Sequence, residues 1–228
     1  MTPALAQSSE LINWDLVANL ADEIRTLTLQ HIVLTVLAVA FGVVIAFPLS
    51  VVCIRRPRLY PLVTTVTGLL YTVPALALMV VLLPVLGLNI WPVVVALTIY
   101  TLLILIRNMV AGVRGVPADV RESAVGMGLT RRQVLWRVEI PLALPVILGG
   151  VRIATVSTIG LVTIGGLFGR GGLGQLIFDG LNRFSSTRII LGAGLSVLLA
   201  LVADGLLLLL QRGLSPWARK AGIRTVAT

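Results

Sequence analysis

The sequence predicts an all-α integral membrane protein with about five membrane-spanning helices. Of its 228 residues, 57% are hydrophobic and only 12% are charged, about half the charged fraction of a soluble domain. The mean hydropathy is +1.04. A spanning helix needs roughly 20 mostly apolar residues, and five stretches supply them, at about 28–54, 60–83, 86–106, 142–167 and 189–211. Helices are expected because lipid cannot satisfy backbone groups and these runs lack the alternation of barrel strands.

The positive charges predict how the chain is oriented, with the N-terminus outside and the C-terminus in the cytoplasm. Thirteen Lys and Arg residues fall in the segments 55–58, 107–137 and 212–224, whereas four fall in the loops and termini between them. Loops rich in Lys and Arg stay on the cytoplasmic side. The expected organisation is an external segment 1–27, a transmembrane domain 28–211 with a cytoplasmic loop 108–141, and a cytoplasmic tail 212–228.

The segment before the first span contains acidic residues and lacks the apolar core of a signal peptide, so no cleavable signal is expected. Apolar residues recur at helical spacing over 8–26, which favours an amphipathic helix on the outer surface. A loosely ordered tail is the alternative. Near the outer end of the first span, His31 is interpreted as a hydrogen-bonded structural residue. The one cysteine, Cys53, excludes an intrachain disulfide and is expected to fill apolar space.

The second and fourth spans carry the residues that we predict to line a pore. In the second span Pro74 is expected to kink the helix, close to Tyr71 and Thr72. The fourth span is rich in small and hydroxyl residues, which allow close helix approach. Its pore-lining candidates are Thr155, Thr158 and Thr163. Plain helix packing is the alternative for both spans.

The last span is rich in leucine and contains one carboxylate, Asp204. An ionisable side chain within a span is a functional candidate by default. Our interpretation here is structural: Asp204 caps the helix or pairs with Arg212.

The loop between the third and fourth spans is the most charged part of the chain. Pro117 is placed at the first position of a helix that Gly126 and Gly128 then end. Thr130 and Gln133 form a capping box that starts a second helix, which Pro141 and Pro145 stop or kink. We call residues 117–141 the elbow. Its residue pattern alone fits either a docking surface for another protein or an ordinary loop.

The elbow resembles the EAA loop of ABC-importer permeases, because Glu122, Ala124, Gly126 and the stretch 140–145 stand at that family's spacing. Ser123 departs from the family's pattern, because it stands at the second position of the Glu-Ala-Ala triplet that gives the loop its name. Other stretches resemble the subfamily that imports quaternary-amine osmoprotectants such as glycine betaine, choline and carnitine: TVPALAL (72–78), YTLLILIRN (100–108), GVRIAT (150–155) and GRGGLGQLIFDGL (169–181). The similarity spans about residues 28–210. Arg170 departs, since the family more often has a small residue there.

The resemblance implies a type I ABC-importer permease in the bacterial cytoplasmic membrane. It implies a second permease chain, two cytoplasmic ATPase subunits docked on the elbows, and an external substrate-binding protein. The residues expected to contact the ATPase are Glu122, Ser123, Ala124, Gly126 and Gly128. ATP and magnesium would be held by the ATPase, so no cofactor is expected in this chain, and no catalytic activity. Because only 5% of residues are aromatic, the aromatic cage for a quaternary amine is expected in the binding protein.

Other functions fit the residues less well. A phosphate loop is excluded because no GxxxxGK[ST] pattern occurs, and nucleic-acid binding because the arginines form no aromatic-interleaved basic face. A single cysteine leaves no Cys-based metal site, and no protease motif lies within the spans. Within the same class, a permease for methionine or another small amine is the alternative. A stand-alone secondary transporter or channel is a remote one, since repeats and intramembrane ionisable groups are scarce.

Overall fold

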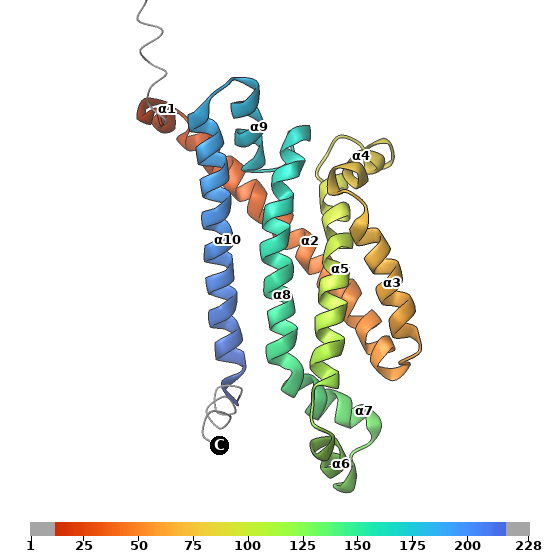
Figure 1. The fold of residues 1–228 in the computed structure, drawn as a ribbon. Coiled ribbons are helices and arrows are strands. Elements are labelled where there is room, and N and C mark those ends of the chain that lie inside the picture. Colours follow the sequence, from red (N-terminus) through yellow and green to blue (C-terminus); the bar gives the residue numbers. More distant parts are fainter. Residues whose placement is uncertain (1–11, 218–228) are drawn as a thin grey trace, which may run out of the picture. The chain divides into compact units, whose positions relative to one another are not determined.

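The computed structural model describes residues 12–217, and these residues form helices and no strands (Figure 1). The all-helical prediction is therefore confirmed. The helices, in chain order, are α1 (Trp14–Asn19), α2 (Ala21–Arg55), α3 (Leu59–Thr72), α4 (Ala75–Leu86), α5 (Trp91–Arg114), α6 (Ala118–Gly126), α7 (Arg131–Val134), the π-helix η2 (Leu135–Glu139), α8 (Ile140–Val162), the 3₁₀-helix η3 (Thr163–Phe168), α9 (Gly174–Asn182) and α10 (Ser186–Leu214).

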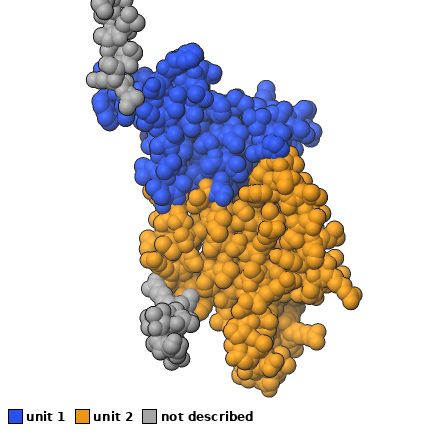
Figure 2. All heavy atoms as spheres, in the orientation of Figure 1, with its two compact units in different colours: residues 1–38, 74–97, 157–201 blue, residues 39–73, 98–156, 202–228 orange. Residues whose placement is uncertain are grey.

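The chain divides into two compact units, coloured separately in Figure 2. Unit 1 comprises residues 1–38, 74–97 and 157–201, and unit 2 comprises residues 39–73, 98–156 and 202–228. The long helices α2, α5, α8 and α10 contribute residues to both units.

Apolar packing between helices that are distant in sequence holds each unit together. In unit 1 the largest cluster joins Leu34 of α2, Met79 of α4, Leu97 of α5 and Val162 of α8, all essentially inaccessible to solvent. In unit 2 a second cluster joins α2, α5 and α8 through Ala46, Cys53, Leu105, Val110 and Ala154. Cys53 is buried there, as the sequence predicts for an apolar filler.

Within residues 12–217, four helical stretches are long and apolar enough to cross a membrane: Ala21–Arg55, Trp91–Arg114, Arg131–Phe168 and Ser186–Leu214. The number rises to five if α3 and α4 together make one span. About five spans were expected, so the prediction is confirmed in number.

The second predicted span, 60–83, is wrong as a single helix. The chain breaks between α3 and α4 because Val73 and Pro74 both adopt extended backbone conformations, with ψ of 130° and 131°. A residue before proline is driven away from the helical region, so the break is complete where a kink was expected. The Val73 carbonyl is left outside both helices, and the Tyr100 hydroxyl donates a hydrogen bond to it.

The fourth span also changes character at its end, where α8 tightens into η3 and then turns through a glycine-rich loop. A Cβ on Gly171 would stand 1.8 Å from the Gly166 nitrogen. Gly172 has φ of +53° and lies directly against the backbone of His31. No other residue type fits these two positions, which bring the loop against α2 within unit 1.

His31 has the structural role that the sequence predicts. The side chain is completely buried, and its Nε2 lies 3.0 Å from the Ile159 carbonyl oxygen of α8. Close by, Gln175 of α9 donates a hydrogen bond to Gln30 of α2 at 2.9 Å. These contacts fasten α2 to the end of α8 and to α9 within unit 1.

Over the described residues, the predicted N-terminal amphipathic helix is interrupted between α1 and α2. Asn13 caps the N-terminus of α1. Leu20 separates the end of α1 at Asn19 from the start of α2 at Ala21. The Asn13 amide donates to the Thr187 hydroxyl at the start of α10. Residues 8–11 of the predicted helix and residues 218–228 of the predicted tail lie outside the described residues.

Candidate functional site

The elbow forms as two short helices joined by a tight glycine turn, shown in green between α5 and α8 in Figure 1. Gly128 has φ of +86°, a conformation that glycine adopts without strain. Thr130 accepts a hydrogen bond from the Gln133 amide while Gln133 accepts one from the Thr130 amide, so the predicted capping box is confirmed. Pro117 is the N-cap of α6, one position before the one expected for it.

Arg121 fastens the elbow to the end of α5. Its Nη2 donates to the carbonyl oxygens of Val113 at 2.7 Å and Arg114 at 3.2 Å. The last carbonyls of a helix have no partner within the helix, and a cation there also complements the helix dipole. The Arg121 Nε lies 2.8 Å from a carboxylate oxygen of Glu139. One side chain therefore joins α5, α6 and η2.

Sequence reasoning missed this role, because the contacts of Arg121 join α6 to two other elements, and the sequence alone does not show how these elements fold against one another. The available signal was Glu139, the single acidic residue in 130–145, a stretch that otherwise carries the charges of Arg131, Arg132 and Arg137.

The second helix of the elbow is not stopped at Pro141 or Pro145, which leaves a kink as the predicted effect of the two prolines. Helical structure runs on from Arg131 through η2 and α8. Within η2 the Ile140 amide bonds the Leu135 carbonyl five residues back. A proline ring at 141 would clash with the carbonyl of Arg137 in a regular helix, and the wider π-turn before it relieves that clash. The elbow is thus continuous with the fourth span.

Aromatic rings hold the elbow and the end of α5 against the rest of unit 2. Trp136 of η2 packs at 5.8 Å between ring centroids on Phe47 of α2. The Arg114 guanidinium lies 4.5 Å above the centre of the Tyr60 ring of α3, within the range of a cation–π contact.

The residues predicted to contact an ATPase lie at one end of α6 and in the turn after it. Glu122, Ser123, Gly126 and Gly128 are exposed, whereas the Ala124 side chain is buried at 1% exposure. Next to them Val125 and Met127 are apolar and 56% and 74% exposed. A side chain at Gly126 would meet nothing within 4 Å. The exposed part of the elbow is therefore a small, partly apolar surface with one carboxylate.

Beside this surface lies a cavity of about 620 Å³. Its walls come from the end of α2, from α6, α7 and η2, and they combine aliphatic side chains with four arginines. The lining residues are Ile54, Arg55, Arg121, Val125, Arg131, Arg132, Val134, Leu135 and Glu139.

Replacing Glu139 tests how strongly the elbow is anchored. Since the Arg121 and Glu139 side chains are 33% and 15% exposed, we expect Glu139→Gln to lower the free energy of unfolding by about 1–2 kcal/mol, between surface and buried pairs. Denaturant unfolding of the purified permease measures it. The exposed Glu122→Gln is the matched control, expected to change stability by less than about 0.5 kcal/mol. Equal effects of the two variants would contradict the anchoring role.

The predicted pore-lining residues are divided between the two units. Tyr71, Thr72 and Thr155 belong to unit 2, and Pro74, Thr158 and Thr163 belong to unit 1. Tyr71, Thr72 and Pro74 are exposed, Thr155 and Thr163 are half-buried, and Thr158 is buried. Pore lining by these residues stays a prediction.

Three of the pore candidates use their hydroxyls within their own helices. Thr72, Thr155 and Thr163 donate to the carbonyls of Leu69, Val151 and Gly160, at 2.7, 2.8 and 2.6 Å. A hydroxyl bonded in this way keeps only its oxygen lone pairs for another molecule.

Tyr71 lies beside a second tyrosine. The ring of Tyr100, 7% exposed, packs against Tyr71 with centroids 5.2 Å apart and planes tilted by 50°. The Tyr100 hydroxyl is held by the Val73 carbonyl, so the inner ring is fixed. Tyr71 is 39% exposed and is the accessible ring of the pair.

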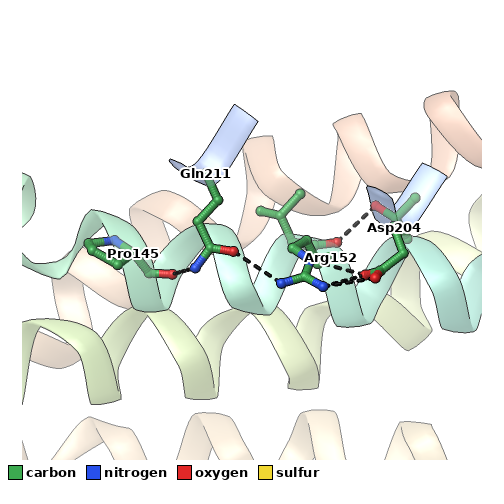
Figure 3. Close-up of polar contacts among 6 residues, drawn as sticks. Pro145, Arg152, Asp204 and Gln211 are labelled. Atoms are coloured by element: carbon green, nitrogen blue, oxygen red, sulfur yellow. Dashed lines mark hydrogen bonds and ion pairs between the residues drawn. The ribbon is translucent and has the colours of Figure 1, made fainter. Parts of the chain in front are cut away.

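The carboxylate of the last span has a different partner from the one predicted. Asp204 pairs with Arg152 of α8, with Nη2 2.8 Å from both carboxylate oxygens, as Figure 3 shows. The prediction named Arg212 because helical spacing was the only guide to distance. Asp204 is one half of an ion pair, but the predicted partner, Arg212, is wrong: the partner, Arg152, comes from another helix.

The comparisons with known proteins agree with this architecture. A family model described as "Binding-protein-dependent transport system inner membrane component" matches residues 38–216. The choline transport system permease protein OpuBB of Bacillus subtilis is 39% identical over 83% of this chain and 87% of its own length. The glycine betaine/carnitine/choline permease protein OpuCD of the same organism is 41% identical over 85% of each chain. The osmoprotectant import permease OsmW of Salmonella typhimurium is 39% identical over 86% of this chain and 94% of its own length.

Solved structures share the fold at lower identity. An inward-facing structure of the MetNI methionine ABC transporter matches with a TM-score of 0.76 and 22% identity, covering 89% of this chain and 99% of the matched chain. A crystal structure of an amino acid ABC transporter matches with a TM-score of 0.73 and 18% identity, covering 88% and 98%. The predicted fold class, that of a type I ABC-importer permease, is thereby confirmed.

Proposed function

The chain belongs to the family of binding-protein-dependent transport system inner membrane components, and on that premise we propose that it is the permease subunit of an ABC importer for quaternary-amine compatible solutes. In this proposal two permease chains pair in the membrane. Two ATPase subunits dock on the elbows, and an external binding protein delivers glycine betaine, choline, carnitine or a similar solute. ATP is hydrolysed by the ATPase subunits.

The elbow supports the ATPase part of the proposal. Its outer surface is exposed and free of side-chain obstruction at Gly126, while Arg121 and Trp136 fix its inner side to α5 and α2. Because helix continues from Arg131 into α8, a force on the elbow is applied directly to a membrane span. A surface that is fixed to a span and open to a partner suits the transmission of a conformational change.

The solute class is supported by relatives at 36–41% identity, which are named as permeases for choline, glycine betaine, carnitine or osmoprotectants. The methionine transporter structures share only 22–24% identity and speak for the fold. Quaternary ammonium groups are recognised by aromatic faces. With 5% aromatic residues, the permease contributes little selectivity, and the binding protein contributes most of it.

Uptake by the reconstituted importer tests the solute class. Proteoliposomes that contain the permease, its ATPase and its binding protein are loaded with ATP, and uptake of labelled choline, glycine betaine, carnitine and methionine is measured in separate assays. We expect uptake of at least one of the three quaternary amines and no uptake of methionine above the background without ATP. Uptake of methionine and of none of the quaternary amines would overturn the solute proposal in favour of the small-amine alternative.

Tyr71 is the residue of this chain best placed to contact a quaternary amine during passage. We expect Tyr71→Leu to raise the KM for uptake about fivefold, the equivalent of losing a cation–π contact of about 1 kcal/mol. Tyr71→Phe keeps the ring and is the matched control, with uptake close to that of the wild type. Equal uptake by the Leu and Phe variants would show that the ring does not contact the solute.

A further inference from the structure

Two charged residues face each other between α8 and α10 in unit 2, with the side chains of Arg152 and Asp204 24% and 39% exposed. Arg152 lies in the middle of α8 and Asp204 within the leucine-rich α10, both in helices long and apolar enough to span a membrane. The Arg152 Nε and Nη2 lie 3.0 and 2.8 Å from Oδ1 of Asp204, and Nη2 lies 2.8 Å from Oδ2. This two-pronged geometry is the strong form of a charge-assisted hydrogen bond.

A second attachment point lies two turns along the same pair of helices. The Arg152 Nη1 donates to the Gln211 side-chain oxygen at 3.2 Å, and the Gln211 amide donates to the Pro145 carbonyl at 2.8 Å. Figure 3 shows this chain of contacts from Pro145 through Gln211 and Arg152 to Asp204. We call these four residues the polar joint.

The spacing of the polar joint restrains both sliding and rotation. Pro145 and Arg152 are seven residues apart on α8, and Asp204 and Gln211 are seven apart on α10. Seven residues return to nearly the same helix face about 10 Å along the axis. The lower-numbered residue of α8 meets the higher-numbered residue of α10, so the two helices run antiparallel and are fastened at two levels.

Residues 202–214 of α10 have no buried apolar side chain that could hold this part of the helix against α8 in place of the polar joint. No residue from 202 to 214 is buried, and the buried residues of α10, which are Thr187, Gly192 and Ser196, all belong to unit 1. The apolar clusters of unit 2 contain α8 residues such as Ala143 and Ala154 and, among the described residues, none from α10. Leu206 and Leu209, each 63% exposed, point away.

The joint connects α10 to the element that continues into the elbow. Residues 131–168 form one continuous helical stretch that includes η2, Pro145 and Arg152. Any displacement of the elbow therefore reaches Arg152 through α8. Separating Arg152 from Asp204 within a span would leave two charges without partners in an apolar environment, which is strongly unfavourable.

We propose that Arg152, Asp204 and Gln211 are positioning residues that keep the inner half of α10 attached to α8 throughout the transport cycle. When the elbow moves, α8 and α10 move as one body, so that the conformational change of the ATPase subunits is transmitted to both helices. The inference rests on the proposed role of the elbow. Without the joint, α8 moves while α10 stays behind, and ATP is hydrolysed with little solute imported.

The main test measures solute imported per ATP hydrolysed in proteoliposomes that hold the complete importer. We expect Asp204→Asn and Arg152→Gln to lower this ratio at least about fivefold, the low end of a coupling between two sites, with the KM for the solute unchanged. The charge swap Arg152→Asp with Asp204→Arg is expected to recover most of the ratio. A swap that stays as impaired as the single variants, or single variants that couple normally, would overturn the proposal.

Gln211→Ala addresses the possibility that an unpaired charge prevents assembly of the importer. It removes the two hydrogen bonds of the second attachment point without leaving a charge. We expect a partial loss of about twofold to threefold in the ratio, smaller than for the charge variants, because neutral hydrogen bonds contribute little net free energy. Leu210→Ala is the matched control, because Leu210 is exposed on the neighbouring position and is expected to leave coupling intact. Equal ratios for the two variants would contradict the joint.

A second measurement needs no solute and so separates failure of this inference from failure of the proposed function. Spin labels at Ile153→Cys on α8 and Leu206→Cys on α10, both exposed, are placed in a Cys53→Ser background. We expect the mean distance between the two labels to be the same in the nucleotide-free and the ATP-trapped importer. We expect the distribution of distances to broaden when Gln211→Ala is added. A distance that changes with nucleotide in the otherwise unaltered joint would overturn the proposal.

Discussion

Replacing Gly126 by phenylalanine is expected to abolish docking of the ATPase without harming the permease itself. A side chain at this position meets nothing within 4 Å of its Cβ, so no strain arises within the chain. If an ATPase surface covers the elbow, the new ring must be accommodated in that interface. We expect affinity for the ATPase to fall at least about 30-fold, which corresponds to the roughly 2 kcal/mol of an interface hot spot.

Co-purification of the ATPase with the permease, and uptake by the reconstituted importer, measure this effect. Gly213→Phe is the matched control, because that glycine also has open space around it and lies at the end of α10, outside the elbow. Gly126→Ala adds a smaller side chain at the same position, and we expect it to lower the affinity for the ATPase less than Gly126→Phe does. Normal docking of the Gly126→Phe permease would remove the elbow from the interface.

The second large effect is expected at Gly171, where alanine should prevent unit 1 from folding. Its Cβ would stand 1.8 Å from the Gly166 nitrogen and 2.4 Å from the Gly165 carbonyl carbon. Both are backbone atoms, which cannot rotate away as a side chain does. We expect a loss of at least about 3 kcal/mol, at the upper end of overpacking effects, and hence little folded permease in the membrane.

Gly169→Ala separates steric clash from backbone strain. Gly169 has φ of +64° but open space around its Cβ position, so alanine there costs about 1 kcal/mol for the left-handed conformation alone. The amount of monodisperse permease after extraction in mild detergent measures both variants. Equal yields of the Gly171→Ala and Gly169→Ala proteins would mean that the close approach of 165–174 does not limit folding.

The sequence predicts the helical class and the number of spans because both follow from local composition. Apolar length, the capping box at Thr130 and the glycine turn at Gly128 each depend on residues that are adjacent or three apart. The break at Val73 and Pro74 is only half predicted. Proline predicts a distortion, but its size depends on whether a neighbour satisfies the Val73 carbonyl that a complete break leaves outside both helices, and Tyr100 is 27 residues away.

The contacts that complete the candidate site join residues far apart in the chain, and a single sequence does not reveal them. Arg121 meets Glu139, and Arg152 meets Asp204 from 52 residues away. For Asp204 the prediction chose Arg212, the nearest cation on the same helix. Charge balance within the spans points to the correct partner, since Arg152 and Asp204 are the two charges deepest in predicted apolar segments.

The claim that everything else depends on is that the elbow lies on the cytoplasmic side and is covered by the ATPase. A single cysteine, Gly126→Cys in a Cys53→Ser background, is labelled with a membrane-impermeant maleimide in vesicles of both orientations. We predict labelling in inside-out vesicles only, and protection when the ATPase subunits are bound. Labelling from the outer face, or equal labelling with and without the ATPase, would contradict the account.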